Sequence, residues 1–260
     1  MEPQNQSEWE APPPPEKIEA DPPQMSELAT LGNIFFEPGK TFEDLRRKPR
    51  FVLAGLIVII AASIFQIAFI QKVGFERIIR ERIESSSRTS QMSSEQKEKI
   101  IEQQSGPIVK AISYAAVPVV LTIIFFLGGL IYWLGSNAMG GTGRYLGGVS
   151  AWVYSSLPPT LLFMVANLVV LLVKTVDEID INNSQGGLVQ ANPSMFIDAK
   201  ASPVLSALLS SIDLFAIWGW ILAAIGLQKL FRISSGAAWA IVLIVGLCGV
   251  TARVVWALFF

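Results

Sequence analysis

The chain has 260 residues, a net charge of −1, no histidine and one cysteine, Cys248. Hydrophobic residues make up 52% and charged residues 16%, against about 25% charged residues in an ordinary soluble domain. The single cysteine excludes an intramolecular disulfide, and the absence of histidine leaves no ligand set for zinc or haem. The balanced charge does not favour nucleic acid. We therefore expect no cofactor, no metal site and no nucleic-acid partner.

Residues 1–25 are rich in Pro, Glu and Gln and nearly free of apolar residues. Such a segment buries too little apolar surface to offset the entropy of ordering, so we expect a disordered, Pro-rich tail. The tail lacks the basic start and adjoining apolar stretch of a signal peptide, and no cleaved leader is expected.

Residues 26–50 predict an amphipathic pre-membrane segment of two short helices on the inner membrane surface. Thr41, with Asp44 three positions later, has the form of a capping box that begins the second helix after a break at Pro38-Gly39. A basic cluster follows, formed by Arg46, Arg47, Lys48 and Arg50. It would face anionic headgroups, at about 1 kcal/mol per basic residue. The alternative is that the cluster only fixes the topology.

Five long apolar runs follow, each close to or above the length of about 20 residues that a helix needs to cross a bilayer. They predict an all-α fold, a polytopic membrane bundle with five transmembrane helices. The basic cluster before the first run places the N-terminus in the cytoplasm and the C-terminus outside, in the inner membrane if the organism is prokaryotic. The runs are about 51–71, 108–134, 149–173, 203–228 and 236–258.

Two loops show further patterns. The first outer loop, 75–104, carries opposite charges at i,i+4 spacing around a Ser-rich stretch, which is typical of a solvated helical hairpin. The inner loop from Met139 to Gly148 is rich in glycine, but no strand precedes it and no Gly-Lys-Ser/Thr ends it. It is interpreted as a flexible turn rather than a phosphate site.

Asp213 in the fourth run and Arg253 in the fifth are charges at membrane depth. Counted from the turn between these runs, at 1.5 Å per residue, they lie about 24 and 27 Å along their helices, nearly level. They are predicted to form an intramembrane polar pair, and a proton or ion pathway remains the alternative. Gln66 and Asn167 are expected to bond across helices.

Three prolines, Pro118, Pro158 and Pro159, interrupt the second and third runs. Each removes a backbone donor, so we expect helix breaks or kinks, and paired breaks can also line a cavity.

Three segments together resemble the Yip domain family, the Ypt/Rab-interacting integral membrane proteins, in its prokaryotic branch. They are the segment from Phe35 to Phe51, the stretch from Gly140 to Pro159, and the run from Ser210 to Leu227, which is similar to the family's Asp-Leu-Phe-x-x-Trp span. The resemblance covers about 35–258 and implies five spans with the N-terminus inside. Eukaryotic members of that family bind small GTPases through a cytoplasmic N-terminal region and act in vesicle traffic, so the resemblance implies a related role as an expectation.

The expected function is that of a non-enzymatic scaffold that organises the membrane, and binds lipids or partners at the cytoplasmic face. Its partners would be anionic headgroups and another membrane or peripheral protein held through the N-terminal region. The alternative is a transporter or channel subunit that uses Asp213 and Arg253. The oligomeric state stays open.

Overall fold

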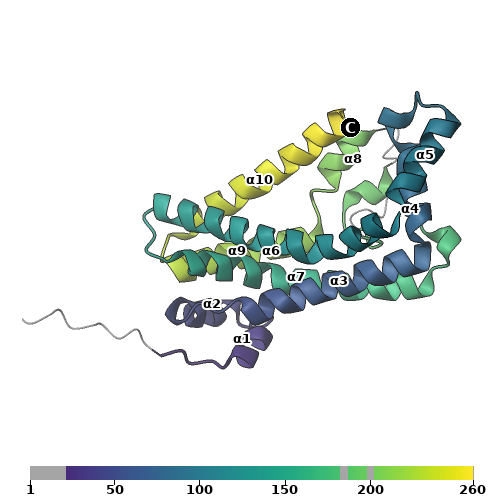
Figure 1. Ribbon diagram of the computed structural model, residues 1–260. Coiled ribbons are helices and arrows are strands. Elements are labelled where there is room, and N and C mark those ends of the chain that lie inside the picture. Colours follow the sequence, from purple (N-terminus) through teal and green to yellow (C-terminus); the bar gives the residue numbers. More distant parts are fainter. Residues whose placement is uncertain (1–21, 182–186, 198–201, 260) are drawn as a thin grey trace, which may run out of the picture.

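The computed structural model describes residues 22–181, 187–197 and 202–259, and within these ranges the chain is helical without strands (Figure 1). The predicted tail, except for Pro22 to Met25, lies outside the described residues. The helices are α1 (Glu27–Asn33), α2 (Pro38–Arg47), α3 (Val52–Val73), α4 (Phe75–Ser85), α5 (Ser94–Gln104), α6 (Pro107–Ala138), α7 (Tyr145–Val173), α8 (Pro203–Leu209), α9 (Leu214–Phe231) and α10 (Ser235–Phe259). Short 3-10 turns lie at Ser87–Thr89, Val176–Glu178 and Pro193–Phe196.

Five of these helices, α3, α6, α7, α9 and α10, are long and apolar enough to cross a membrane. This confirms the predicted all-α bundle with five spans. The fourth run differs from its prediction, because 203–228 is not one helix. It is divided into α8 and α9 by a turn at 210–213, and the span itself begins at Leu214.

The centre of the bundle is α7, which packs against α3, α6 and α9. Glycines allow the contact between α6 and α7. A Cβ added to Gly129 would lie 2.6 Å from Val149 Cα, and one added to Gly148 would lie 2.2 Å from the Gly129 carbonyl oxygen. In a membrane, apolar side chains gain little free energy by moving from lipid to a helix interface. Close packing of the helix backbones is therefore the main interaction that holds the helices together.

Contacts between helices show which residues lie at the same level along the bundle. A Cβ on Gly55 of α3 would lie 3.4 Å from the Phe125 ring and 3.9 Å from Val153 of α7. At the other end of α3, the Lys72 ammonium donates to the Lys174 carbonyl at 2.6 Å. α3 has 22 residues, or about 33 Å, close to the thickness of a hydrocarbon core. We infer that the hydrocarbon layer of the membrane extends along α7 from the level of Val153 to the level of Lys174.

The two ends of the bundle carry different segments. At the first, called the N-terminal end, α1 and α2 lie with the loop between α6 and α7 and the turn between α9 and α10 (Figure 1). At the second, called the hairpin end, α4 and α5 lie with the loop that follows α7.

The glycine-rich loop from Met139 to Gly148 is a packing element at the N-terminal end. The Thr142 N–H donates to the Phe231 carbonyl at 3.1 Å. A Cβ on Gly143 would come within 2.2 Å of the Phe231 ring, and Gly140 has a φ of +82°. Gly143 is thus needed so that the loop can lie against the Phe231 ring, and Gly140 adopts a left-handed backbone conformation. The interpretation of this loop as a flexible turn did not include these packing roles.

The prolines do not end their helices. α6 continues through Pro118, and α7 continues through Pro158 and Pro159. Pro159 cannot donate to the Ser155 carbonyl four residues before it. That carbonyl oxygen faces Gly219 of α9, where an added Cβ would lie 3.7 Å away.

The predicted charged hairpin is confirmed. Arg80 of α4 pairs with Glu76 at 3.1 Å and with Glu98 of α5 at 2.8 Å. The hydrogen bond from Arg80 holds the pKa of Glu98 below its usual value. Between the helices lies a small apolar core that includes Ile79 and Ile101.

Gln66 also behaves as expected, because its side-chain amide donates from α3 to the Ser113 carbonyl of α6 at 2.8 Å.

The packing of α6 on α7 can be tested at Gly129. Gly129→Ala is expected to cost about 1–3 kcal/mol of stability, because the added methyl group meets the backbone of α7. Gly249→Ala is the control, since Gly249 lies in α10 with nothing within 4 Å of its added Cβ. It should be neutral or stabilising by up to about 1 kcal/mol. The measurement is thermal unfolding in detergent, and equal midpoints for the two variants would contradict the assignment.

Candidate functional site

Residues 22–50, called here the N-terminal module, pack against the helical bundle. Ile34, Phe42 and Leu45 are fully buried and belong to the main hydrophobic core. The Phe42 ring lies against α9, where a Cβ on Gly226 would be 3.0 Å from it. α2 therefore uses its apolar face to pack on protein, whereas the sequence predicted that this face rests on the membrane surface.

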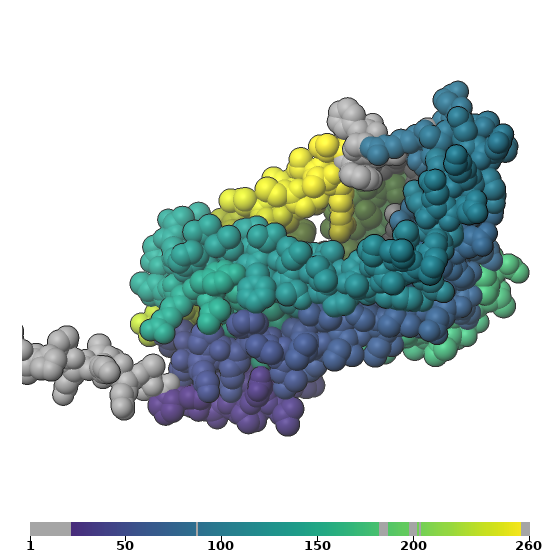
Figure 2. All heavy atoms as spheres, viewed as in Figure 1, coloured from purple at the N-terminus to yellow at the C-terminus, as the bar shows by residue number. Residues whose placement is uncertain are grey.

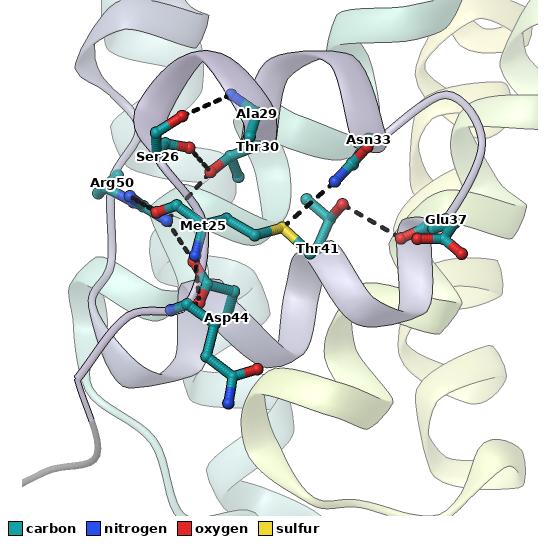
Figure 3. A network of polar contacts seen from close by, with 10 residues as sticks. Met25, Ser26, Ala29, Thr30, Asn33, Glu37, Thr41, Asp44 and Arg50 are labelled. Atoms are coloured by element: carbon teal, nitrogen blue, oxygen red, sulfur yellow. Dashed lines mark hydrogen bonds and ion pairs between the residues drawn. The ribbon is translucent and has the colours of Figure 1, made fainter.

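A network of polar contacts connects the start of the module to its end (Figure 3). The Asp44 side chain is 2% exposed and forms an ion pair with Arg50. It also accepts from the backbone N–H groups of Gln24 at 2.5 Å and Met25 at 3.3 Å. Arg50 donates in addition to the Met25 carbonyl at 2.8 Å and the Thr30 hydroxyl at 3.0 Å. The network joins the chain before α1 to the chain after α2.

The predicted capping box at Thr41 and Asp44 is wrong. α2 begins at Pro38, and its N-cap residue, Glu37, makes no side-chain capping bond. Proline suits the first turn of a helix because its missing N–H would have no partner there. Thr41 instead donates from its hydroxyl to the Glu37 carbonyl at 3.1 Å, inside the helix.

The predicted basic cluster is divided by the fold. Arg50 turns inward to Asp44 and is not available to headgroups. Arg46 and Arg47 lie half-buried in the last turn of α2, where positive charge complements the helix dipole. Lys48 is exposed. A membrane-facing role for these last three residues remains a prediction.

One ion pair between the module and α9 is partly exposed. Glu43 and Lys229 lie 2.6 Å apart, with side chains 47% and 40% exposed. The hydrogen bond from Lys229 lowers the pKa of Glu43. Exposed pairs contribute little, so the apolar contacts should carry the docking.

Docking of the module can therefore be tested with two neighbouring variants. Phe42→Ala should destabilise the protein by about 3–5 kcal/mol, the usual cost of removing a buried aromatic ring. Glu43→Gln should cost less than about 1 kcal/mol, because water screens the pair with Lys229. Limited proteolysis between α2 and α3, together with thermal unfolding, measures both. A larger loss for Glu43→Gln than for Phe42→Ala would show that charge holds the module.

The second region is a cavity of about 1000 Å³ lined mainly by α7, α8, α9 and α10 together with the loop from Gly187 to Ser194. Asp213 and Arg253 both line it. Its polar lining also comes from serine, threonine and amide side chains, among them Ser155, Ser156, Thr160, Gln190, Asn192, Ser206, Ser210 and Ser211.

Asp213 is the N-cap of α9. Its Oδ1 accepts from the backbone N–H groups of Phe215 at 2.9 Å and Ala216 at 3.2 Å. The Asn192 amide donates to its other oxygen at 3.3 Å, and the Leu214 N–H donates to the Ala191 carbonyl at 3.1 Å. An aspartate before an apolar run is a recognised start signal for a helix. The sequence analysis overlooked this signal because it treated 203–228 as one span.

Asn167 also forms hydrogen bonds with the loop that follows α7, at Leu188 and Val189. It is fully buried in α7, and its Oδ1 accepts from the N–H groups of Leu188 and of Val189, the latter at 3.1 Å. Its amide donates to the Phe163 carbonyl at 2.7 Å. Asn167 thus binds the loop rather than another helix, and it does not line the cavity.

Asp213 and Arg253 form no ion pair with each other among the contacts of the described residues, although both line the same cavity. Their pairing remains a prediction, and the structure gives Asp213 a capping role that needs no arginine.

A double-mutant cycle separates the two roles of Asp213. The capping role predicts that Asp213→Ala costs about 0.5–2 kcal/mol and that Asp213→Asn costs less, because asparagine also caps well. The losses of Asp213→Asn and Arg253→Gln should add, as they do for residues without direct contact. Thermal unfolding of the four proteins in detergent is the measurement. Partial recovery in the double variant would instead establish the ion pair.

Five apolar helices, with polar groups at their depth that are capped or bonded, define a multi-pass integral membrane protein. Residues 32–256 match the family model of the Yip1 domain, so the chain belongs to that family, as the resemblance implied. The membrane protein YknW of Bacillus subtilis (strain 168) is 27% identical over 222 residues, which cover 85% of this chain and 87% of that protein. This similarity supports the prokaryotic branch. No solved structure matches the chain.

Proposed function

We propose that the protein is a non-enzymatic membrane scaffold whose N-terminal module binds acidic lipids at the cytoplasmic face. The observation that carries this proposal is the contrast between the two surfaces of the module. Ile34, Phe42 and Leu45 are buried against the bundle, while Leu28 is 75% and Phe36 is 85% exposed. A module held this firmly leaves its exposed apolar residues free for lipid or for a partner.

The depth of Phe36 supports contact with lipid. The neighbouring Phe35 ring lies 6.4 Å from the ring of Trp218 in α9, in an edge-to-face arrangement. Trp218 lies next to Gly219, which faces the Ser155 carbonyl, so it lies beyond the level of Val153 and inside the inferred hydrocarbon layer. The loop between α1 and α2 would then reach into the membrane beside α9.

The charges at the N-terminal end support its cytoplasmic placement. Basic residues near the ends of spans favour the cytoplasmic side. Besides the three residues that remain of the basic cluster, this end carries Arg144 before α7 and Arg232 after α9. With five spans, the proposal places the C-terminus outside.

The cavity favours a second candidate, a transporter or channel subunit. A span divided at 210–213 that presents a half-helix N-terminus to a polar cavity is a common arrangement in transporters. The single divided span, without a second one in the described residues, makes this candidate the weaker of the two.

The scaffold proposal is tested with a photo-crosslinking amino acid at position 36 of the full chain in native membranes. The exposed position is expected to yield adducts with the mass of a phospholipid. The same probe at position 42 is the control, because that side chain is buried against α9 and should react only within the chain.

Removal of residues 1–50 is a poor test, since it deletes Phe42 and Leu45 from the core. Removal of residues 1–21 avoids this problem. A stoichiometric protein adduct at position 36 would show that this surface binds a protein partner instead of lipid. The absence of any adduct at position 36 would contradict the proposed contact.

A further inference from the structure

The cavity between α7, α8, α9 and α10 lies at the depth of the hydrocarbon layer. The Phe215 ring, next to the start of α9, packs 5.2 Å from the ring of Phe163 in α7. Phe163 precedes Lys174 by about 16 Å along α7, at 1.5 Å per residue. Asp213, which caps α9 just before Phe215, therefore lies near the middle of the layer.

Arg253 lies at a similar depth. Gly246 of α10 contacts Trp220 of α9, where an added Cβ would lie 2.9 Å from the indole ring. Asp213 precedes Trp220 by as many residues as Arg253 follows Gly246, and the two helices are antiparallel. The sequence estimate of equal depth agrees with these contacts. A charged side chain at this depth is costly unless it faces water or a binding partner.

The two charged groups differ in how they are satisfied. Asp213 Oδ1 accepts two N–H groups of α9, while Oδ2 has only the 3.3 Å contact with Asn192. Arg253 is exposed, and no described residue bonds or pairs with its guanidinium group. Ser206 of α8 and Thr160 of α7 also line the cavity with hydroxyl groups that donate to no described residue. The cavity thus offers unpaired donors and one carboxylate oxygen, Asp213 Oδ2, that accepts a single long hydrogen bond.

The rest of the cavity is apolar and open at the side. Its lining towards the N-terminal end includes Tyr132, Trp152, Trp220 and Val242. Figure 2 shows an opening between the atoms of α10 and those of α6. Gly249 of α10 lines the cavity and has nothing within 4 Å of an added Cβ. A ligand that enters from lipid could therefore place a chain in the opening and its head among the polar groups.

We propose that this cavity binds the headgroup of one phospholipid that carries a primary amine. The phosphate lies on the Arg253 guanidinium group with hydroxyl donors such as Ser206, and the amine lies on Oδ2 of Asp213, which Asn192 contacts only at 3.3 Å. Arginine suits phosphate because its planar fork donates two parallel hydrogen bonds. The amine balances the carboxylate, so neither protein charge stays unpaired at membrane depth. This site does not depend on the scaffold proposal, which concerns the module at the N-terminal end of the bundle.

The test is native mass spectrometry of the full chain in detergent, titrated with phosphatidylethanolamine, phosphatidylglycerol or phosphatidylcholine. The unmodified chain should retain one phosphatidylethanolamine and prefer it to the other two lipids. Arg253→Gln should weaken all binding about tenfold or more, the size expected for loss of a charged hydrogen bond. Lys110→Gln is the control, because Lys110 is exposed on α6 outside the cavity and should bind as the unmodified chain does.

Two further variants separate charge from shape. Asp213→Asn keeps a capping side chain and should abolish only the preference for phosphatidylethanolamine over phosphatidylglycerol. Gly249→Leu should block binding by filling the cavity, whereas Gly236→Leu, at an equally open position of α10 outside the cavity, should not. Circular dichroism and gel filtration establish that each variant is folded.

Three results would overturn the proposal. The first is equal binding by Arg253→Gln and Lys110→Gln. The second is displacement of the lipid by soluble phosphoethanolamine at matched concentration, which would assign the site to a free metabolite. The third is a transmembrane protein, rather than a lipid, crosslinked through a probe at position 249.

Discussion

The close contact of α6 with α7 through Gly129 and Gly148 is the interaction on which the other helices depend. Lipid chains are as apolar as the side chains they touch, so helices gain stability mainly by approaching closely. The backbone of α7 comes within reach of α6, and its other faces then receive α3 and α9. The N-terminal module packs in turn on α9 through Phe42, next to another glycine, Gly226.

A second rule, that buried polar groups must be paired, explains most of the polar residues in the bundle. Asp44 is satisfied by Arg50 and two backbone N–H groups, and Asn167 by the loop that follows α7. Asp213 is satisfied in part by the start of its own helix. Arg253 differs from these residues because it is exposed and no described residue pairs with it, and for this reason the cavity is the most informative place to look for a ligand.

The module and the cavity lie at different levels of the same helical bundle. The module is built into the main core, so changes there act on the fold as well as on any partner. The cavity is bounded by α8, by α10 and by the loop from Gly187 to Ser194. The two proposed sites are therefore separate, one at the N-terminal end and one at the depth of the cavity, and variants at Phe36 and at Arg253 would affect them separately.

The sequence by itself determined the number of spans, the family and the nearly equal level of Asp213 and Arg253, because run length and helical rise are local properties. It also indicated the hairpin of α4 and α5 and a bond from Gln66 to a neighbouring helix, which the structure identifies as α6. Only the tertiary structure decided that Arg50 turns inward to Asp44, that 203–228 divides at Asp213, and that Asn167 holds a loop. These outcomes depend on which distant backbone groups come near each side chain. Spacing along the chain cannot supply that information, since the partners lie up to 22 residues away and reach one another only when the helices pack.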